Sequence, residues 1–227
     1  MSHSWISQRE RGNEWVLHII CWVAREIGRP FARSLLYPIT LYFFLTSPST
    51  RRASREFLVR VLPKTPSWID VFKHHLVFSS TILDRVYLLT GREDVLDIKI
   101  HNEEALLSLV ASGRGCILLG SHFGSFEVLR ALGLQRLTDT MALKVLMYHD
   151  HGQTITRFLN VLNPELSGTV IQMGKRDTVF RVMECIEKGH IVGMLGDRHV
   201  DQDKTMLCCF LGGNALFPTG PAALAVA

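Results

Sequence analysis

The sequence predicts an α/β protein, in which a helical amino-terminal part leads into a layered domain with a largely parallel central sheet. Apolar residues make up 47% of the 227 residues and charged residues 20%, a balance that allows a sizeable core and excludes disorder and coiled coil. Up to about residue 92 the apolar residues recur at helical spacing. Beyond it, short apolar runs alternate with amphipathic segments. That alternation is typical of strand–helix units with parallel strands.

The first part of the chain predicts helices at about 11–27, 31–46, 49–62 and 66–91. Ser47, Ser49 and Ser67 are candidate helix starts, and Gly91 is a candidate stop.

The second part predicts strands at 95–100, 115–120, 143–147, 169–173, 191–195 and 206–211. Helices are expected between most of them, at about 102–112, 123–136, 152–162 and 177–188. The glycines and prolines of 210–221 predict a loop followed by a helix amino terminus. Because the apolar run that follows has no helix stop, we expect the domain to be cut inside its last helix.

Charge is unevenly distributed along the chain. The net charge is +4, yet residues 1–64 hold ten Lys or Arg against four Asp or Glu. The apolar stretches at 15–24 and 34–50 are shorter than the roughly 18–20 apolar residues of a membrane-spanning helix, and Pro38 interrupts the second. We interpret 1–64 as a basic, membrane-anchoring helical segment and 65–227 as the α/β domain. Buried core helices are the alternative, and nucleic-acid binding is not expected.

Five cysteines without a C-x-x-C pair predict reduced thiols in a cytoplasmic setting. His149 and His151 lack a third ligand nearby, so no metal site is expected, and no cofactor is expected either. The sequence has no Walker loop, dinucleotide fingerprint or G-x-S-x-G elbow, which argues against nucleotide enzymes and serine hydrolases.

The candidate catalytic residues are His122 and Glu127, in a segment that predicts strand, tight turn and helix at 115–127. On one helix, five positions correspond to about 140° of rotation, so the two side chains meet only if His122 lies in the turn. Glu127 would then accept a hydrogen bond from one imidazole nitrogen and leave the other to remove a proton from a hydroxyl. A structural histidine at a capped helix start is the alternative.

A second pair of polar residues, Asp197 and Arg198, directly follows the apolar run at 191–195. The carboxyl ends of parallel strands share one edge of a sheet, where α/β proteins bind ligands. Arg198 could hold a phosphate or carboxylate, and Asp197 could orient an acceptor group. An ordinary surface ion pair is the equal alternative.

Taken together, these segments resemble the bacterial lipid A biosynthesis acyltransferases, the lauroyl and myristoyl transferases of the lysophospholipid acyltransferase superfamily. Residues 120–127 resemble the family's H-x-x-x-x-[DE] motif, and Asp197 falls where members carry an aspartate after a strand. The resemblance runs from about Leu36 to the end, with Ser125-Phe126 where members often have Asn-Trp. Arg157 is the nearest candidate for a motif arginine.

The resemblance implies an α/β acyltransferase fold and transfer of a fatty acyl group to a lipid hydroxyl. The donor would be an acyl carrier protein or coenzyme A thioester, and the acceptor a lipid A-like glycolipid or related lipid. His122 would be the general base and Glu127 its partner. From geometry, backbone amides near Gly124 and Ser125 could stabilise the oxyanion. The expected location is the cytoplasmic face of the bacterial inner membrane.

Two alternatives from other classes remain at this point. One is a thioesterase in which His122 activates water, and the other is a non-catalytic membrane-associated fragment.

Overall fold

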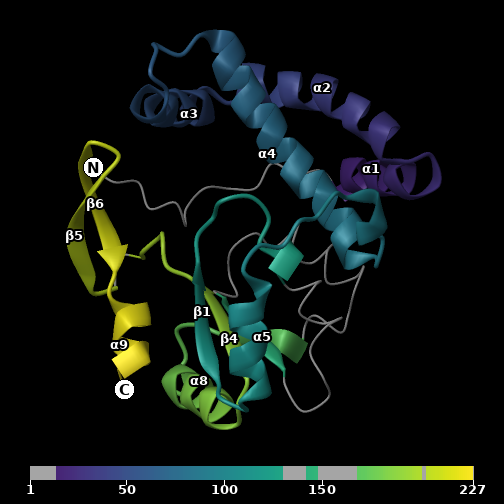
Figure 1. The fold of residues 1–227 in the computed structure, drawn as a ribbon. Coiled ribbons are helices and arrows are strands. Elements are labelled where there is room, and N and C mark those ends of the chain that lie inside the picture. The colour runs from purple at the N-terminus through teal and green to yellow at the C-terminus, as the bar shows by residue number, and fades with distance from the viewer. Residues whose placement is uncertain (1–13, 130–141, 148–167, 201–202, 227) are drawn as a thin grey trace. The chain divides into compact units, whose positions relative to one another are not determined.

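The structure is a computed structural model that describes residues 14–129, 142–147, 168–200 and 203–226. It divides into two compact units. One comprises Gly12–Val95 with Cys209–Ala215, and the other comprises Leu96–Cys208 and Leu216–Ala227 with Met1–Arg11. The first is helical and the second holds the parallel sheet (Figure 1). The helical unit extends beyond residue 64, the predicted end of the anchoring segment. That segment was defined by its charge, and its role in membrane anchoring stays a prediction.

The helical unit contains α1 (Glu14–Glu26), α2 (Arg29–Thr46), α3 (Pro48–Val61) and α4 (Trp68–Leu89). All four lie within a few residues of the predicted helices. The start of α4 at Ser67 is fixed by a capping box, in which the Ser67 hydroxyl accepts from the Asp70 N–H and the Asp70 carboxylate accepts from the Ser67 N–H. Across the described ranges, the helices are all too short or too polar to cross a membrane.

Polar contacts join α4 to α1 and α2. The Arg29 guanidinium donates two hydrogen bonds of 2.9 Å to the Asp84 carboxylate, a bidentate ion pair between α2 and α4. The fully buried Tyr87 donates its hydroxyl proton to the Ala24 carbonyl of α1 at 2.9 Å. Each bond satisfies a polar group that helix packing removes from water, so α4 holds α1 and α2 in a defined orientation.

His74 connects α4 to the arginine-rich helix α3. Its Nδ1 lies 2.6 Å from the buried Ser54 hydroxyl, and Phe57 stacks on its ring at a centroid distance of 5.4 Å. Burial lowers the pKa of His74, and the positive charge that His75 can carry lowers it further. The contact between α3 and α4 therefore favours the neutral imidazole.

We predict that acidification weakens the helical unit through His74. Because the pKa is lower in the folded protein than the ordinary 6.5, the unfolded chain gains the proton first. Stability is fully present above about pH 6.5 and falls as the pH drops toward the lower folded-state pKa. Thermal unfolding midpoints measured from about pH 7.5 to about pH 5.5 should show this loss. His74→Gln should flatten the curve, whereas His101→Gln, at an exposed position outside the unit, should not. Parallel curves for all three proteins would contradict the assignment.

The α/β unit is built on a parallel sheet of four strands in the order β1-β4-β2-β3. These strands are β1 (Cys116–Gly120), β2 (Leu143–Met147), β3 (Val170–Gln172) and β4 (Ile191–Leu195). All three pairings are parallel, which confirms the predicted sheet. The described helices of this unit are α5 (Glu103–Ala111), α8 (Thr178–Glu187) and α9 (Gly220–Val226).

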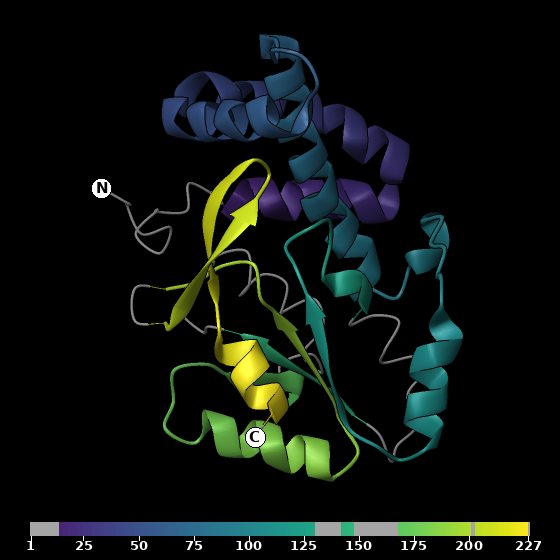
Figure 2. The same ribbon diagram turned by 60° about the vertical axis from the view of Figure 1, so that its left-hand side comes forward.

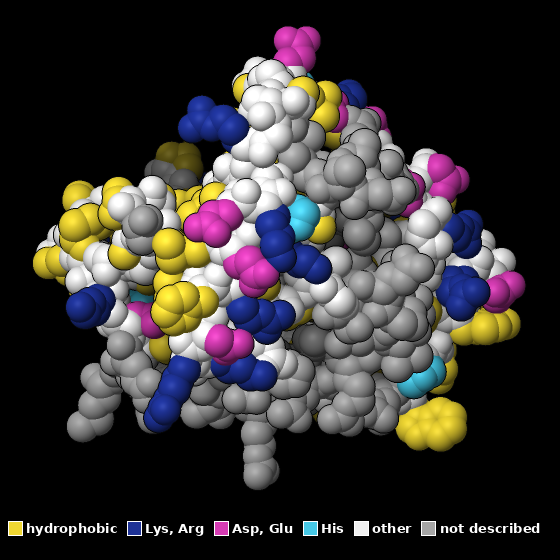
Figure 3. All heavy atoms as spheres, turned by 90° about the horizontal axis from the view of Figure 1, so that it is seen from below, with side chains coloured by type: hydrophobic (Ala, Val, Ile, Leu, Met, Phe, Trp, Pro, Cys, Tyr) yellow, Lys and Arg dark blue, Asp and Glu magenta, His cyan; other side chains and the backbone are white. Residues whose placement is uncertain are grey.

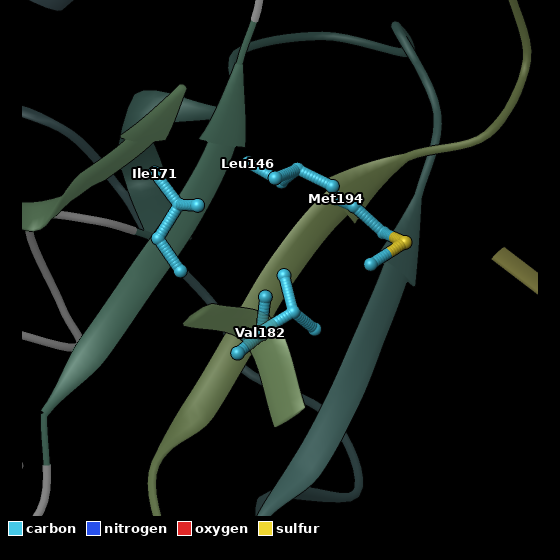
Figure 4. Close-up of a cluster of buried hydrophobic side chains, with 5 residues drawn as sticks. Leu146, Ile171, Val182 and Met194 are labelled. Atoms are coloured by element: carbon cyan, nitrogen blue, oxygen red, sulfur yellow. The ribbon is translucent and has the colours of Figure 1, made fainter. Parts of the chain in front are cut away.

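Successive side chains of a strand lie on opposite faces of the sheet, and each face packs against a different helix. Val192 and Met194 of β4 pack in a buried cluster (Figure 4). The other members of the cluster are Leu146 of β2, Ile171 of β3 and Val182 of α8. Ile191, one residue before Val192, packs on the opposite face with Leu143 of β2 and Leu106 of α5. Figure 2 shows the sheet between α8 and α9 on one side and α5 on the other. The period-two alternation of the strands therefore produces a three-layer unit with a core on each face.

Two segments differ from the predictions. Residues 95–100, predicted as a strand, contain the end of a short 3₁₀ turn (Glu93–Val95) and then irregular chain. Asp97 and Lys99 are exposed there and pair with each other at 3.6 Å. Apolar and polar residues do alternate over 96–100, but none of the described strands pairs with this segment. Residues 213–218, predicted as loop, form β6 (Gly213–Pro218), paired with β5 (Thr205–Phe210). Leu211 and Gly212 both have positive φ, the geometry of a tight hairpin turn, which leucine rarely adopts.

Candidate active site

The candidate active site lies where β1 and β4 end side by side. Gly120 lies opposite Leu195 in the register of these strands, and the Gly196 N–H donates to the Gly120 carbonyl at 3.0 Å. His122 and Asp197 each follow two residues after these paired positions. Parallel pairing thus brings together two side chains that are 75 residues apart in the sequence.

The His122 Nδ1 and the Asp197 Oδ1 are 2.9 Å apart. A carboxylate can only accept, so the hydrogen bond places a proton on Nδ1 and leaves a lone pair on Nε2 in the neutral ring. Both side chains keep about a third of their surface exposed, at 38% and 28%. The arrangement is that of a general base with an orienting carboxylate, open to a substrate.

The loop after β1 turns sharply before a helix begins. The Phe123 N–H donates to the Ser121 carbonyl at 2.8 Å, and Gly124 has a φ of 80°, which glycine adopts without strain. Residues 127–129 are helical. The ring of Phe126 lies against Gly193 of β4, where a Cβ would stand 3.6 Å from the Phe126 Cζ. The predicted strand, turn and helix are therefore confirmed, with His122 in the turn.

Glu127 lies at the start of that helix and is 6% exposed. The Asp197 carboxylate is the partner of His122 Nδ1. Glu127 as a partner of His122, and its catalytic role, stay predictions. Beside it, the Ser125 hydroxyl is buried and has no hydrogen-bond partner within the ranges that the structure describes.

The remaining predicted residues have different outcomes. Arg198 is exposed in the loop after β4, next to Asp197. Gly124 and Ser125 lie in the His122 loop, as expected. Arg157 lies outside the described residues, as does the pair His149 and His151. Among the described residues there is no group of three or more His, Cys, Asp or Glu side chains that could hold a metal ion.

The start of α9 also reaches this edge of the sheet. A Cβ on Gly196 would lie 2.8 Å from Leu119 Cδ1 and 3.6 Å from Pro221 Cγ. Glycine at 196 therefore allows β1, β4 and the amino terminus of α9 to approach closely. The sequence predicted a helix start following the glycines and prolines of 210–221, and its position at the edge of the sheet comes from packing around Gly196.

Two large apolar side chains near His122 are exposed to solvent. Leu119, in β1, is 58% exposed, and Phe123, the neighbour of His122, is 94% exposed. Their exposure is not visible in the sequence, because an apolar residue near a strand end is normally buried. An exposed apolar pair beside a polar catalytic group suits a substrate with both a hydroxyl and a hydrocarbon part.

Comparison with known proteins gives one family. Residues 5–227 match the sequence model of the bacterial lipid A biosynthesis acyltransferases, which covers nearly the whole chain and contains the site. The chain belongs to this family. No curated protein matches the sequence. Membership in the lipid A acyltransferase family implies acyltransferase activity toward lipid A-like acceptors, hence an acyl donor and a lipid acceptor.

We predict that Asp197 controls the tautomer of His122. In the wild-type protein at alkaline pH, nitrogen-15 NMR should show the proton of His122 on Nδ1, because the carboxylate accepts from it. Asp197→Ala should convert this signal to a mixture of tautomers. Asp177→Ala, which removes an exposed carboxylate before α8, is the matched control and should leave it unchanged. A His122 signal that is identical in all three proteins would refute the role of Asp197.

Proposed function

We propose that this acyltransferase moves a fatty acyl group from a thioester donor to a hydroxyl of a lipid A-like glycolipid or related lipid. The donor would be an acyl carrier protein or coenzyme A. The observation that supports the proposal is the His122–Asp197 pair, held at the strand ends so that Nε2 of the neutral ring can accept a proton. An imidazole oriented in this way can accept a proton from a hydroxyl, and the family acts on acceptors of this kind.

The reaction needs no covalent enzyme intermediate. His122 Nε2 takes the proton of the acceptor hydroxyl as its oxygen forms a bond to the thioester carbonyl carbon. The tetrahedral intermediate then collapses, the carbon–sulfur bond breaks, and the leaving thiolate receives the proton from His122. Asp197 stabilises the imidazolium that forms between the two steps. The base is thereby restored for the next cycle.

The loop after His122 supplies groups that could stabilise the negative charge. Amides near Gly124 and Ser125 lie just before the helix that begins at Glu127, and amides at a helix start are suited to an oxyanion. Arg198, exposed beside Asp197, is suited to a phosphate on the acceptor, a contact that Arg157 could share. We assign Glu127 a supporting role, in which its buried carboxylate maintains the loop that carries His122.

Replacing His122 by Ala should lower acyl transfer by about 10²- to 10⁴-fold, the usual contribution of a general base. The measurement is transfer of a labelled acyl group from its carrier-protein or coenzyme A thioester to a lipid A precursor. His101→Ala is the matched control, since His101 is exposed and precedes α5. Circular dichroism should show the same fold for both variants.

Three results would overturn the proposal. Undiminished transfer by His122→Ala would remove the assigned base. Release of the acyl group as free acid at a rate independent of acceptor would indicate a thioesterase. No turnover by the wild-type protein, with vesicle binding that is the same in His122→Ala, would indicate a non-catalytic membrane protein.

We further propose that the helical unit holds the enzyme on an anionic membrane. Trp15, Ile19 and Trp22 of α1 share one helical face and are each more than half exposed; Trp15 is 79% exposed. Arginine and aromatic side chains also lie together in α3 and α4 of this unit, where the Arg55 guanidinium lies over the Trp68 ring, 5.4 Å from its centroid. Aromatic side chains next to arginines suit the boundary between headgroups and hydrocarbon.

The double substitution Trp15→Ser and Trp22→Ser should weaken binding to phosphatidylglycerol vesicles by at least about tenfold, since tenfold corresponds to only about 1.4 kcal/mol of lost apolar burial. Co-sedimentation measures this. Phe180→Ser removes a similarly exposed aromatic residue from α8, in the α/β unit, and is the control. Equal losses in the two proteins would show that α1 has no special part in membrane binding.

A further inference from the structure

A second polar site lies at the edge of the sheet opposite the candidate active site. A cavity of about 190 Å³ is lined by side chains that precede or begin the strands and by one face of α8. Lys144 is the second residue of β2, and His190 directly precedes β4. Five-residue strands at about 3.3 Å per residue put this edge roughly 16 Å from His122. The cavity is therefore separate from the catalytic pair.

The wall formed by α8 follows from helical spacing. Arg181, Glu184 and Lys188 recur at intervals of three and four, so they lie on one face of the helix together with Cys185. Figure 3, which views the molecule from below Figure 1, shows Lys and Arg side chains near the middle of that face, with Asp and Glu side chains and a histidine among them. The strands contribute the opposite wall.

Among the described residues that line this cavity, positive charge exceeds negative charge by two. Three of their side chains are cationic, Lys144, Arg181 and Lys188, and one is a carboxylate, Glu184. The Lys188 ammonium donates to Glu184 Oε1 at 2.6 Å, and this contact raises the pKa of Lys188 and lowers that of Glu184. Their pairing leaves Lys144 and Arg181 as the excess.

Donors for a bound anion are in place. The Lys144 ammonium donates to the Gly168 carbonyl at 3.0 Å, which holds it at the cavity and leaves two of its three protons for other acceptors. His190 Nδ1 accepts from the Ala142 N–H at 3.3 Å, so in the neutral ring the proton is on Nε2 and is available as a donor. The Arg181 guanidinium adds a planar, bidentate donor.

We propose that this cavity, the basic pocket, binds the phosphate group of a phosphate monoester. Its volume is below the roughly 300–1,000 Å³ typical of drug-sized ligands, so it suits a compact group rather than an acyl chain. A phosphate monoester carries about −1.5 to −2 charges at neutral pH, which matches the excess of two cations. A carboxylate would neutralise only half of that excess. The proposal does not depend on the catalytic role of His122.

Inorganic phosphate is the first probe, titrated at constant ionic strength and followed by phosphorus-31 NMR and by the thermal unfolding midpoint. The double substitution Lys144→Gln and Arg181→Gln should weaken phosphate binding by at least about tenfold, because it removes two charge-assisted contacts. Arg176→Gln, at an exposed arginine before α8 that does not line the pocket, is the matched control and should bind like the wild type. Lys144→Arg, which keeps the charge, should retain binding and guards against loss through misfolding.

Two further results separate this proposal from others. His122→Ala should bind phosphate normally, so failure of the catalytic proposal leaves this one intact. Glycerol 3-phosphate that displaces inorganic phosphate would assign a soluble ligand. Phosphatidic acid vesicles that displace inorganic phosphate from the wild type, where phosphatidylglycerol vesicles do not, would assign a lipid headgroup. Equal phosphate binding by the double variant, Arg176→Gln and the wild type would refute the proposal that the basic pocket binds phosphate.

Discussion

The parallel pairing of β1 with β4 is the constraint on which the candidate site depends. Gly120 opposite Leu195 sets where each strand ends, and the next two residues of each chain segment carry His122 and Asp197 to hydrogen-bonding distance. A shift of the register by one residue would move one side chain to the other face of the sheet and separate the pair. The chemistry of the site is therefore a consequence of backbone hydrogen bonds in the sheet.

Close packing maintains that register from both sides. At the carboxyl edge, Gly196 lets Leu119 and Pro221 approach the strand ends. At the other end of β1, Gly115 lies so close to the backbone of the α8 residue Ile186 that a Cβ there would overlap its carbonyl oxygen. The sheet and α8 can therefore pack this closely only with glycine at 115, whereas the nearest atoms at Gly196 are the ends of the Leu119 and Pro221 side chains. The same close packing therefore stabilises the layers and positions His122 and Asp197.

The two edges of the sheet differ in what they offer a ligand. The carboxyl edge carries a base with an orienting carboxylate, next to the exposed apolar side chains Leu119 and Phe123. Among the described residues, the amino edge carries an excess of cations around a small cavity that Val170 and Ile171 also line. A lipid-modifying enzyme handles molecules with hydrocarbon, hydroxyl and phosphate parts, and a parallel sheet provides two separate edges for recognising them.

The sequence by itself determined the class of fold, the helices of the first part and the core strands, because apolar periodicity records which faces are buried. It also determined that His122 lies in a turn after a strand, since a buried run, a glycine and a helix start are local signals. The exposed segment 95–100 was wrongly predicted because a short apolar run resembles a strand even when it has no neighbour to pair with. Only the tertiary structure decided that Asp197 is the partner of His122. Strand order is set by how crossover helices pack, and periodicity carries no information about which strand becomes the neighbour of β1. A carboxylate five residues away was therefore visible in the sequence, whereas the one that the fold brings to Nδ1 lies 75 residues further on.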